Sequence, residues 1–137
     1  EIIITSGGKK IAPVEFEKLI KTHDLIGQIC MVGDGKKFLS ALIVLDGDGG
    51  AEKWANENNI DYDIEIMSKN EKVLAEIQAH VDKSNSKVAN VQQIKKFTLL
   101  SNEWTDSSGE LTPSLKLKRH VVTERYKDEI ESMYEEA

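Results

Sequence analysis

The sequence is poor in cysteine, proline and aromatic residues, with one cysteine, two prolines and 6% aromatics among 137 residues. A single cysteine excludes an intramolecular disulfide and is typical of a reducing compartment. Cys30 lies in an apolar, strand-like run, which favours an unreactive core residue over a catalytic thiol. No apolar run approaches the ~20 residues that span a bilayer, and no signal-peptide pattern occurs. These absences argue against a disulfide-stabilised secreted domain and against a membrane-spanning segment.

Positive charge is also in deficit, since 18 Lys and Arg face 24 Asp and Glu and the formal net charge is −6. We therefore expect no nucleic-acid partner for the chain as a whole. The hydrophobic content of 39% and charged content of 31% are those of an ordinary globular protein. The length predicts one domain, residues 1–137, with a modest core. The chain does not begin with Met, which indicates a piece of a longer protein.

Four runs rich in β-branched and apolar residues predict strands. They occupy residues 2–5, 26–32, 38–45 and 94–100. Gly33 and Gly35 lie between the middle two runs. They predict a hairpin there, because glycine supplies the positive φ angles that tight turns need.

Four segments with helical spacing of apolar residues predict helices. They begin after Pro13, around Trp54, after Ser68 and near Val122, the last being a single closing amphipathic helix. Ser68 and Glu71 have the spacing of a capping box. The mixture predicts an α+β fold, a small mixed or antiparallel sheet with helices packed on it.

The residues alone offer no metal or catalytic cluster. His23, His80 and His120 have no metal-binding spacing with one another or with Cys30, so no metal site is predicted. The glycines at residues 7–8 lack the spacing of a P-loop or of a dinucleotide-binding fingerprint. On pattern alone they predict a turn.

Residues 109–119, GELTPSLKLKR, are the most informative segment. Three cations, Lys116, Lys118 and Arg119, fall within four residues, between a loop containing Gly and Pro and a helical pattern. Cations at a helix N-terminus oppose the macrodipole at a cost of about 0.3 kcal/mol or more each. The cluster is therefore either a solvated helix start or a site for phosphates and carboxylates.

Three segments in a fixed order resemble one family. They are residues 1–14 (EIIITSGGKKIAPV) followed by Glu17, residues 32–43 (VGDGKKFLSALI) and residues 109–119. Together they resemble the C-terminal domain of adenylate-forming enzymes, which include acyl-CoA synthetases, luciferases and peptide-synthetase adenylation domains. Within that family, the residues of these segments are most similar to those of the long-chain fatty acid–CoA ligase branch. The resemblance covers essentially the whole chain. It implies that the chain is a small mobile lid domain, and that the large N-terminal domain and the hinge of such an enzyme are not part of this sequence.

The resemblance implies a two-step ligase reaction. A fatty acid carboxylate first attacks the α-phosphate of ATP and releases pyrophosphate, which gives an acyl-adenylate. The thiolate of coenzyme A then attacks the acyl carbonyl and releases AMP. ATP and CoA are thus substrates, and the Mg²⁺ ligands are expected in the missing N-terminal domain. The lid alone is expected to be inactive.

The resemblance also assigns residues. Lys116 matches the lysine of the adenylation step, whose compact ammonium offsets repulsion between the carboxylate and the phosphate. The superfamily usually has Gly before this lysine where this chain has Leu115, and Lys118 remains open as a rival. A second segment matches the loop that enters the active site for thioester formation and contacts CoA: Ser6, Gly7, Gly8 and Lys9.

The implied partners are the protein's own N-terminal adenylation domain, a fatty acid, ATP and CoA, in the cytoplasm. A lipid substrate is compatible with peripheral membrane contact of the full-length enzyme. The competing interpretation is a free-standing, non-catalytic module that binds a nucleotide or a protein partner. Tight binding of ATP or CoA by the isolated chain would favour that module, since an isolated lid is expected to bind both poorly.

Overall fold

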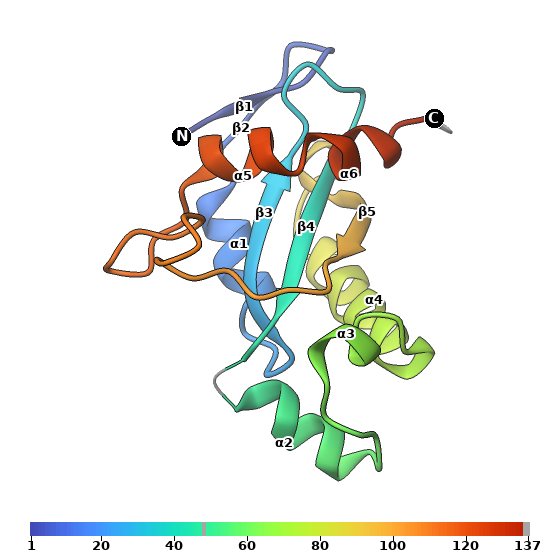
Figure 1. Ribbon diagram of the computed structural model, residues 1–137. Coiled ribbons are helices and arrows are strands. Elements are labelled where there is room, and N and C mark those ends of the chain that lie inside the picture. The colour runs from blue at the N-terminus through green and yellow to red at the C-terminus, as the bar shows by residue number, and fades with distance from the viewer. Residues whose placement is uncertain (48, 136–137) are drawn as a thin grey trace.

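The computed structural model describes residues 1–47 and 49–135 and has the predicted α+β architecture (Figure 1). A three-stranded sheet forms its centre. Strand β3 (Ile26–Val32) pairs antiparallel with β4 (Leu39–Leu45), and β5 (Ile94–Leu99) pairs parallel with β4. The three predicted central strands are therefore confirmed to within a residue at their ends. None of the helices in the described part of the chain is long and apolar enough to cross a membrane.

Strand β4 is buried along all seven residues because both faces of the sheet are covered. Alternation along the strands divides the core in two. Side chains such as Met31 and Ile43 face α1 (Val14–Ile20) and α4 (Glu71–Asn85). Their neighbours Cys30 and Leu42 face the other side, with Trp104 and the two C-terminal helices, α5 (Arg119–Arg125) and α6 (Lys127–Ser132).

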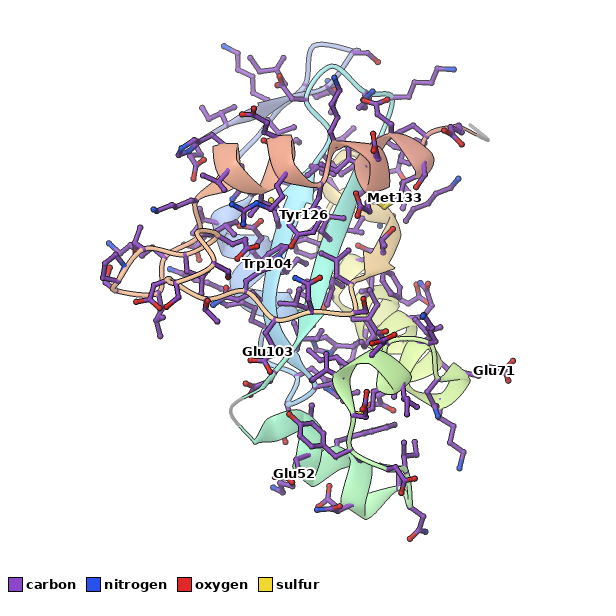
Figure 2. The ribbon with its side chains drawn as sticks, viewed as in Figure 1. Glu52, Glu71, Glu103, Trp104, Tyr126 and Met133 are labelled. Carbon is purple, nitrogen blue, oxygen red and sulfur yellow. The ribbon has the colours of Figure 1, made fainter. Side chains whose placement is uncertain are left out.

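The closing helix is two helices rather than the single one predicted. Tyr126 ends α5 and begins α6, with φ −105° and ψ 29°. Its hydroxyl donates to a Glu110 carboxylate oxygen at 3.1 Å and accepts from Trp104 Nε1 at 3.2 Å. Trp104 and Tyr126 lie between the helices and the preceding connection (Figure 2). These tertiary bonds fix the Tyr126 side chain at the junction of the two helices, a constraint that apolar periodicity does not reveal.

The middle of the chain begins with α2 (Gly50–Glu57) and α3 (Ile64–Met67), and the sequence predicted only the first of these. The predicted capping box at Ser68 is wrong. Ser68 ends α3 and donates to the Glu65 carbonyl, whereas Asn70 caps α4 by accepting from Lys72 N and Val73 N. A 3₁₀ turn (Asn90–Gln92) precedes β5.

The N-terminal strand is shorter than predicted and has a partner that the sequence did not reveal. β1 (Ile3–Ile4) pairs antiparallel with β2 (Lys10–Ile11). The loop between them touches the β3–β4 hairpin, where the Ser6 N–H donates to the Lys36 carbonyl at 2.8 Å. Two hairpins thus meet at one end of the molecule (Figure 1).

Candidate functional site

The cationic segment forms a small hairpin, residues 110–118, here called the lysine hairpin. Leu111 and Leu117 form an antiparallel bridge, the Lys118 N–H donates to the Glu110 carbonyl at 2.8 Å, and the Thr112 N–H donates to the Lys116 carbonyl at 2.8 Å. The turn is closed by the Leu115 N–H, which donates to the Thr112 carbonyl at 2.8 Å. Regular bonding on both arms holds Lys116 at a defined place beside the turn.

Leu115 occupies the left-handed region, with φ 64°. Three-residue hairpin loops place a residue in this conformation directly after a type I turn, and the residue is usually glycine. A side chain with Cβ is strained there by about 1 kcal/mol or more. This geometry explains why glycine suits the position before the lysine. Leu115 is nonetheless 58% exposed, so little burial offsets the strain.

Replacing Leu115 by Gly is expected to give a more stable chain than replacing it by Ala, by about 1 kcal/mol, because only glycine is unstrained at this φ. Urea unfolding of the two variants measures the difference. Ser114 is the matched control, because it is exposed and has no positive φ. There Ala is expected to be the more stable replacement. An Ala variant more stable than Gly at residue 115 would contradict the strained geometry.

The ammonium groups of Lys116 and Lys118 have no bonding partner in the described part of the chain. Neither has a hydrogen bond or ion pair to residues 1–47 or 49–135 through its side chain, and Lys116 is the more exposed. Arg119 differs, since its side chain is 11% exposed and paired with Glu17. Within the described part of the chain, the predicted group of three cations is therefore two lysines without a side-chain partner and one arginine held in an ion pair. The ion pair also offsets the unfavourable dipole interaction expected for Arg119 at the start of α5.

Lys116 lines a cavity of about 460 Å³, here called the lysine cavity. Lys18 of α1 and Lys21, directly after that helix, line it too, together with Glu17 and Glu1. Both carboxylates point to Arg119, at 2.7 and 3.3 Å. The remaining lining charge is positive, which suits an anionic ligand such as a phosphate or carboxylate.

Glu110 anchors the first arm of the lysine hairpin. Its carboxylate is 3% exposed and accepts from Arg125 Nη1 at 2.8 Å, from Tyr126 and from Ser108 Oγ. Burial favours the protonated form, but these hydrogen bonds outweigh it and hold the Glu110 pKa below its ordinary value of 4.5. The ionised carboxylate thus fastens the hairpin to α5.

Glu110→Gln is expected to lower the free energy of unfolding by roughly 1–3 kcal/mol at pH 7, because it removes the charge from a buried, hydrogen-bonded group. Since the folded-state pKa is depressed, the charge stabilises the fold above pH 4.5 and the contribution is lost as the pH falls through the folded-state pKa. Urea unfolding at several pH values measures this. A difference between wild type and variant that stays constant from pH 7 to pH 3 would contradict it.

The predicted CoA-contacting residues Ser6, Gly7, Gly8 and Lys9 form the turn between β1 and β2, here called the glycine loop. Gly8 has φ 83°, and its N–H donates to the Thr5 carbonyl at 2.9 Å. Gly7 and Lys9 line a pocket of about 230 Å³ that shares no lining residue with the lysine cavity. The structure thus places the glycine loop and the lysine hairpin apart (Figure 1).

The other candidate groups are accounted for within the described residues. Burial raises the pKa of the Cys30 thiol to about 12, consistent with an unreactive core cysteine. His23 lies 2.7 Å from a Glu76 oxygen, and His80 Nε2 lies 3.0 Å from the Ile20 carbonyl. In residues 1–47 and 49–135, no group of three or more His, Cys, Asp or Glu side chains is arranged to hold a metal ion.

Sequence reasoning missed the two carboxylates that fix the hairpin, Glu17 and Glu110. Glu17 is acidic yet buried beside Phe16 and Ile20. Its signals in the sequence were its position next to the apolar face of the helix and its place in the first resembling segment, and neither indicated its role. Glu110 lies within the cationic segment, but nothing in its spacing distinguishes it from an exposed loop acid.

The chain is similar to known proteins over its whole length. A family model described as the AMP-binding enzyme C-terminal domain matches residues 1–137. A long-chain-fatty-acid–CoA ligase of Mycobacterium tuberculosis is 38% identical over 136 residues, which covers 98% of this chain and 22% of that protein. Another, from Xenopus laevis, is 36% identical over 155 residues, covering 100% of this chain and 21% of that protein. The chain spans about a fifth of the length of these curated relatives.

Solved structures share the fold. The A-PCP didomain of a carboxylic acid reductase from Segniliparus rugosus, in complex with AMP, superposes with a TM-score of 0.73 at 20% identity, over 97% of this chain and 17% of that one. The adenylation domain of a carboxylate reductase from Mycobacterium chelonae gives a TM-score of 0.73 at 19% identity, over 97% of this chain and 19% of that one.

Proposed function

The chain belongs to the AMP-binding enzyme C-terminal domain family, as its three sequence segments predicted, and we propose that it is the mobile lid of an ATP-dependent long-chain fatty acid–CoA ligase. The observation that carries this proposal is the match of relatives named long-chain-fatty-acid–CoA ligases over 98–100% of the chain. The chain spans about a fifth of those relatives, and we place most of the acyl and nucleotide pockets in the rest of the protein.

In the proposed reaction, a fatty acid carboxylate oxygen attacks the α-phosphorus of ATP. The bond to pyrophosphate breaks, and an acyl-adenylate results. The sulfur of CoA then forms a bond to the acyl carbon, the bond to the AMP oxygen breaks, and acyl-CoA and AMP leave. The lid contributes a different segment to each step.

Lys116 is proposed to act in adenylation. Its ammonium is exposed, carries no internal ion pair in the described part of the chain and lies in a cavity with surplus positive lining charge. A free lysine there can contact the carboxylate and the phosphate oxygens together and reduce their repulsion. Lys118 is the adjacent cation, and we assign it to nucleotide binding rather than to the reacting atoms.

The glycine loop is proposed to act in thioester formation. Nothing lies within 4 Å of the position that a Cβ would occupy at Gly7 or Gly8, so a narrow ligand can approach the backbone closely. This suits the slender pantetheine arm of CoA, with Lys9 available for its phosphates. Its separation from the lysine cavity fits a lid that turns between the two steps.

Magnesium and membrane contact are proposed to involve the rest of the protein. Among the described residues no group of three or more His, Cys, Asp or Glu side chains is arranged to hold a metal ion, and the Mg²⁺ ligands are assigned to the N-terminal domain. We place the enzyme in the cytoplasm, with its own N-terminal adenylation domain as the lid's partner and peripheral membrane contact made by the full-length protein.

The size of the native gene product tests the proposal. An antibody against this chain is expected to detect a protein about four to five times 15.4 kDa in a lysate of the source organism, because the chain makes up about 22% of its relatives. Calorimetry with the isolated chain is expected to show no tight binding of ATP or CoA. A 15 kDa native product that binds either ligand tightly would instead support the free-standing module.

A further inference from the structure

A buried arginine joins three elements directly behind the lysine hairpin. Arg119 Nη2 lies 2.7 Å from Glu17 Oε1, and Nη1 donates to Glu17 Oε2 at 2.9 Å and to the Met31 carbonyl at 2.9 Å. The Arg119 and Glu17 side chains are 11% and 10% exposed. The start of α5 is therefore fastened to α1 and to β3 by one guanidinium.

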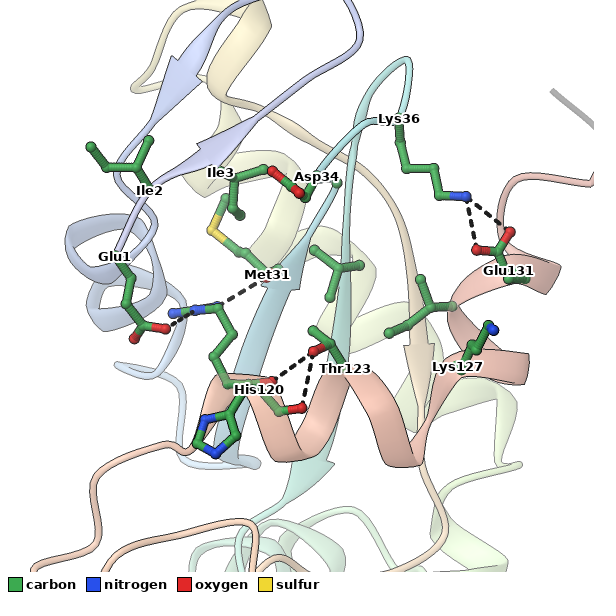
Figure 3. Close-up of a pocket in the computed structure, with 14 residues that line it drawn as sticks. Glu1, Ile2, Ile3, Met31, Asp34, Lys36, His120, Thr123, Lys127 and Glu131 are labelled. Atoms are coloured by element: carbon green, nitrogen blue, oxygen red, sulfur yellow. Dashed lines mark hydrogen bonds and ion pairs between the residues drawn. The ribbon is translucent and has the colours of Figure 1, made fainter.

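The Glu17 carboxylate is fully engaged. Besides the two bonds from Arg119, its Oε2 accepts from the Met31 N–H at 2.6 Å. Glu1, Met31 and Arg119 also line a further pocket, drawn in Figure 3, and Arg119 Nε lies 3.3 Å from a Glu1 oxygen there. Burial opposes the charge on Arg119, but its bonds to Glu17 outweigh this and raise its pKa above the ordinary value.

Stability alone is a poor reason for such a pair. Desolvating two charges costs several kcal/mol, and well-packed apolar residues of similar volume often stabilise a core as well or better. What the pair adds is a fixed geometry, because a guanidinium fork and a carboxylate bind in one orientation. The pair is therefore better explained by the segment that it holds in place than by its contribution to stability.

The pair holds the lysine hairpin. Arg119 follows Lys116 by three residues, and the intervening Lys118 N–H is bonded to the Glu110 carbonyl. Both Glu17 and Arg119 also line the lysine cavity. The first arm is anchored by Glu110 to Arg125, so the hairpin is held by an arginine–carboxylate pair at each end.

We propose that Arg119 and Glu17 are positioning residues for adenylation, whose ion pair sets where the Lys116 ammonium stands relative to the body of the lid. This inference rests on the proposed function. The pair does not touch the reacting atoms. It acts through the three-residue backbone link to Lys116. Its link to the glycine loop is longer, from Arg119 Nε to Glu1 at 3.3 Å and then along β1.

Arg119→Lys in the full-length enzyme tests the inference, because lysine keeps the charge but cannot make the forked contact. The kcat for ATP-dependent adenylate formation is expected to fall about tenfold, with the KM for ATP changed less than twofold. Thioester formation from preformed acyl-adenylate is expected to stay within twofold of wild type. Glu17→Gln is expected to show the same pattern.

A purely structural role predicts a different result, in which both half-reactions fall together or neither changes, and either would overturn the inference. Retained thioester formation also shows that the variant is folded. Glu131→Gln is the matched control. Glu131 of α6 pairs with Lys36 of the β3–β4 hairpin at 2.8 Å (Figure 3), and it does not line the lysine cavity. It is expected to leave adenylation within twofold of wild type.

Failure of the inference can be told from failure of the proposed function by adding Lys116→Ala to the series. If the wild-type full-length protein forms no acyl-adenylate, the proposed function is wrong, and if Lys116→Ala leaves adenylation intact, the role proposed for Lys116 is wrong. If Lys116→Ala abolishes adenylation selectively while Arg119→Lys leaves it unchanged, only the positioning role is wrong.

Discussion

Lys116→Ala in the full-length enzyme is expected to reduce ATP-dependent adenylate formation by ~10²–10³ and to leave thioester formation from preformed acyl-adenylate nearly unchanged. The reason is charge. The two reactants of the first step are both anionic, and the Lys116 ammonium lines the lysine cavity without an ion pair to any of the described residues. The second step joins a thiolate to an acyl carbon and needs no cation at this place. Separate assays of the two half-reactions measure the difference.

Lys118→Ala is the control for this prediction, because Lys118 lies two residues away in the same hairpin and is also unpaired within the described part of the chain. It is expected to raise the KM for ATP with little change in the adenylation kcat. Equal loss of both half-reactions in Lys116→Ala would remove the assigned role. A selective loss in Lys118→Ala alone would move the role to Lys118.

Gly8→Val is expected to give the opposite pattern, with thioester formation reduced about 10²-fold and adenylation preserved. Gly8 has φ 83°, which a β-branched residue adopts only with strain. The glycine loop must then shift, and a displacement of about 1 Å in a positioning segment can cost ~10²-fold in rate. The added methyl groups also occupy the open space that the CoA arm is proposed to use.

Gly49→Val supplies the matched control. Gly49 has φ 110°, precedes α2 at the other end of the molecule from the glycine loop (Figure 1) and, like Gly8, has nothing within 4 Å of its Cβ position. The substitution therefore introduces comparable backbone strain outside the glycine loop. It is expected to leave thioester formation near the wild-type rate. If both valine variants lose thioester formation equally, the effect is general strain and the role assigned to the glycine loop is wrong.

Much of the fold could be predicted because burial on both faces leaves a plain mark on the sequence. Strand β4 reads as a continuous apolar run, and the turn at Gly33 and Gly35 separates it from β3. The β1–β2 pair could not be predicted, because two-residue strands carry too little pattern. The break at Tyr126 was equally hidden, since it is accompanied by contacts with Glu110 and Trp104.

The candidate site divides in a similar way. The resemblance pointed to Lys116 and the glycine loop, and the residues alone marked the cationic segment. The pairing of Arg119 with Glu17 could not be predicted, because the partners are 102 residues apart. The sequence also does not distinguish an arginine in a buried ion pair from the exposed lysines beside it. The left-handed conformation of Leu115 was also not predicted, although the glycine that the superfamily usually has at this position is consistent with it.

The most direct test of the whole account is the stoichiometry of the reaction of the full-length protein that contains this chain. With a long-chain fatty acid, ATP and Mg²⁺, the account predicts that adding CoA yields acyl-CoA and AMP in equal amounts, whereas residues 1–137 alone yield neither. Failure of the full-length protein to form acyl-CoA from any long-chain fatty acid, or release of ADP in place of AMP, would contradict it.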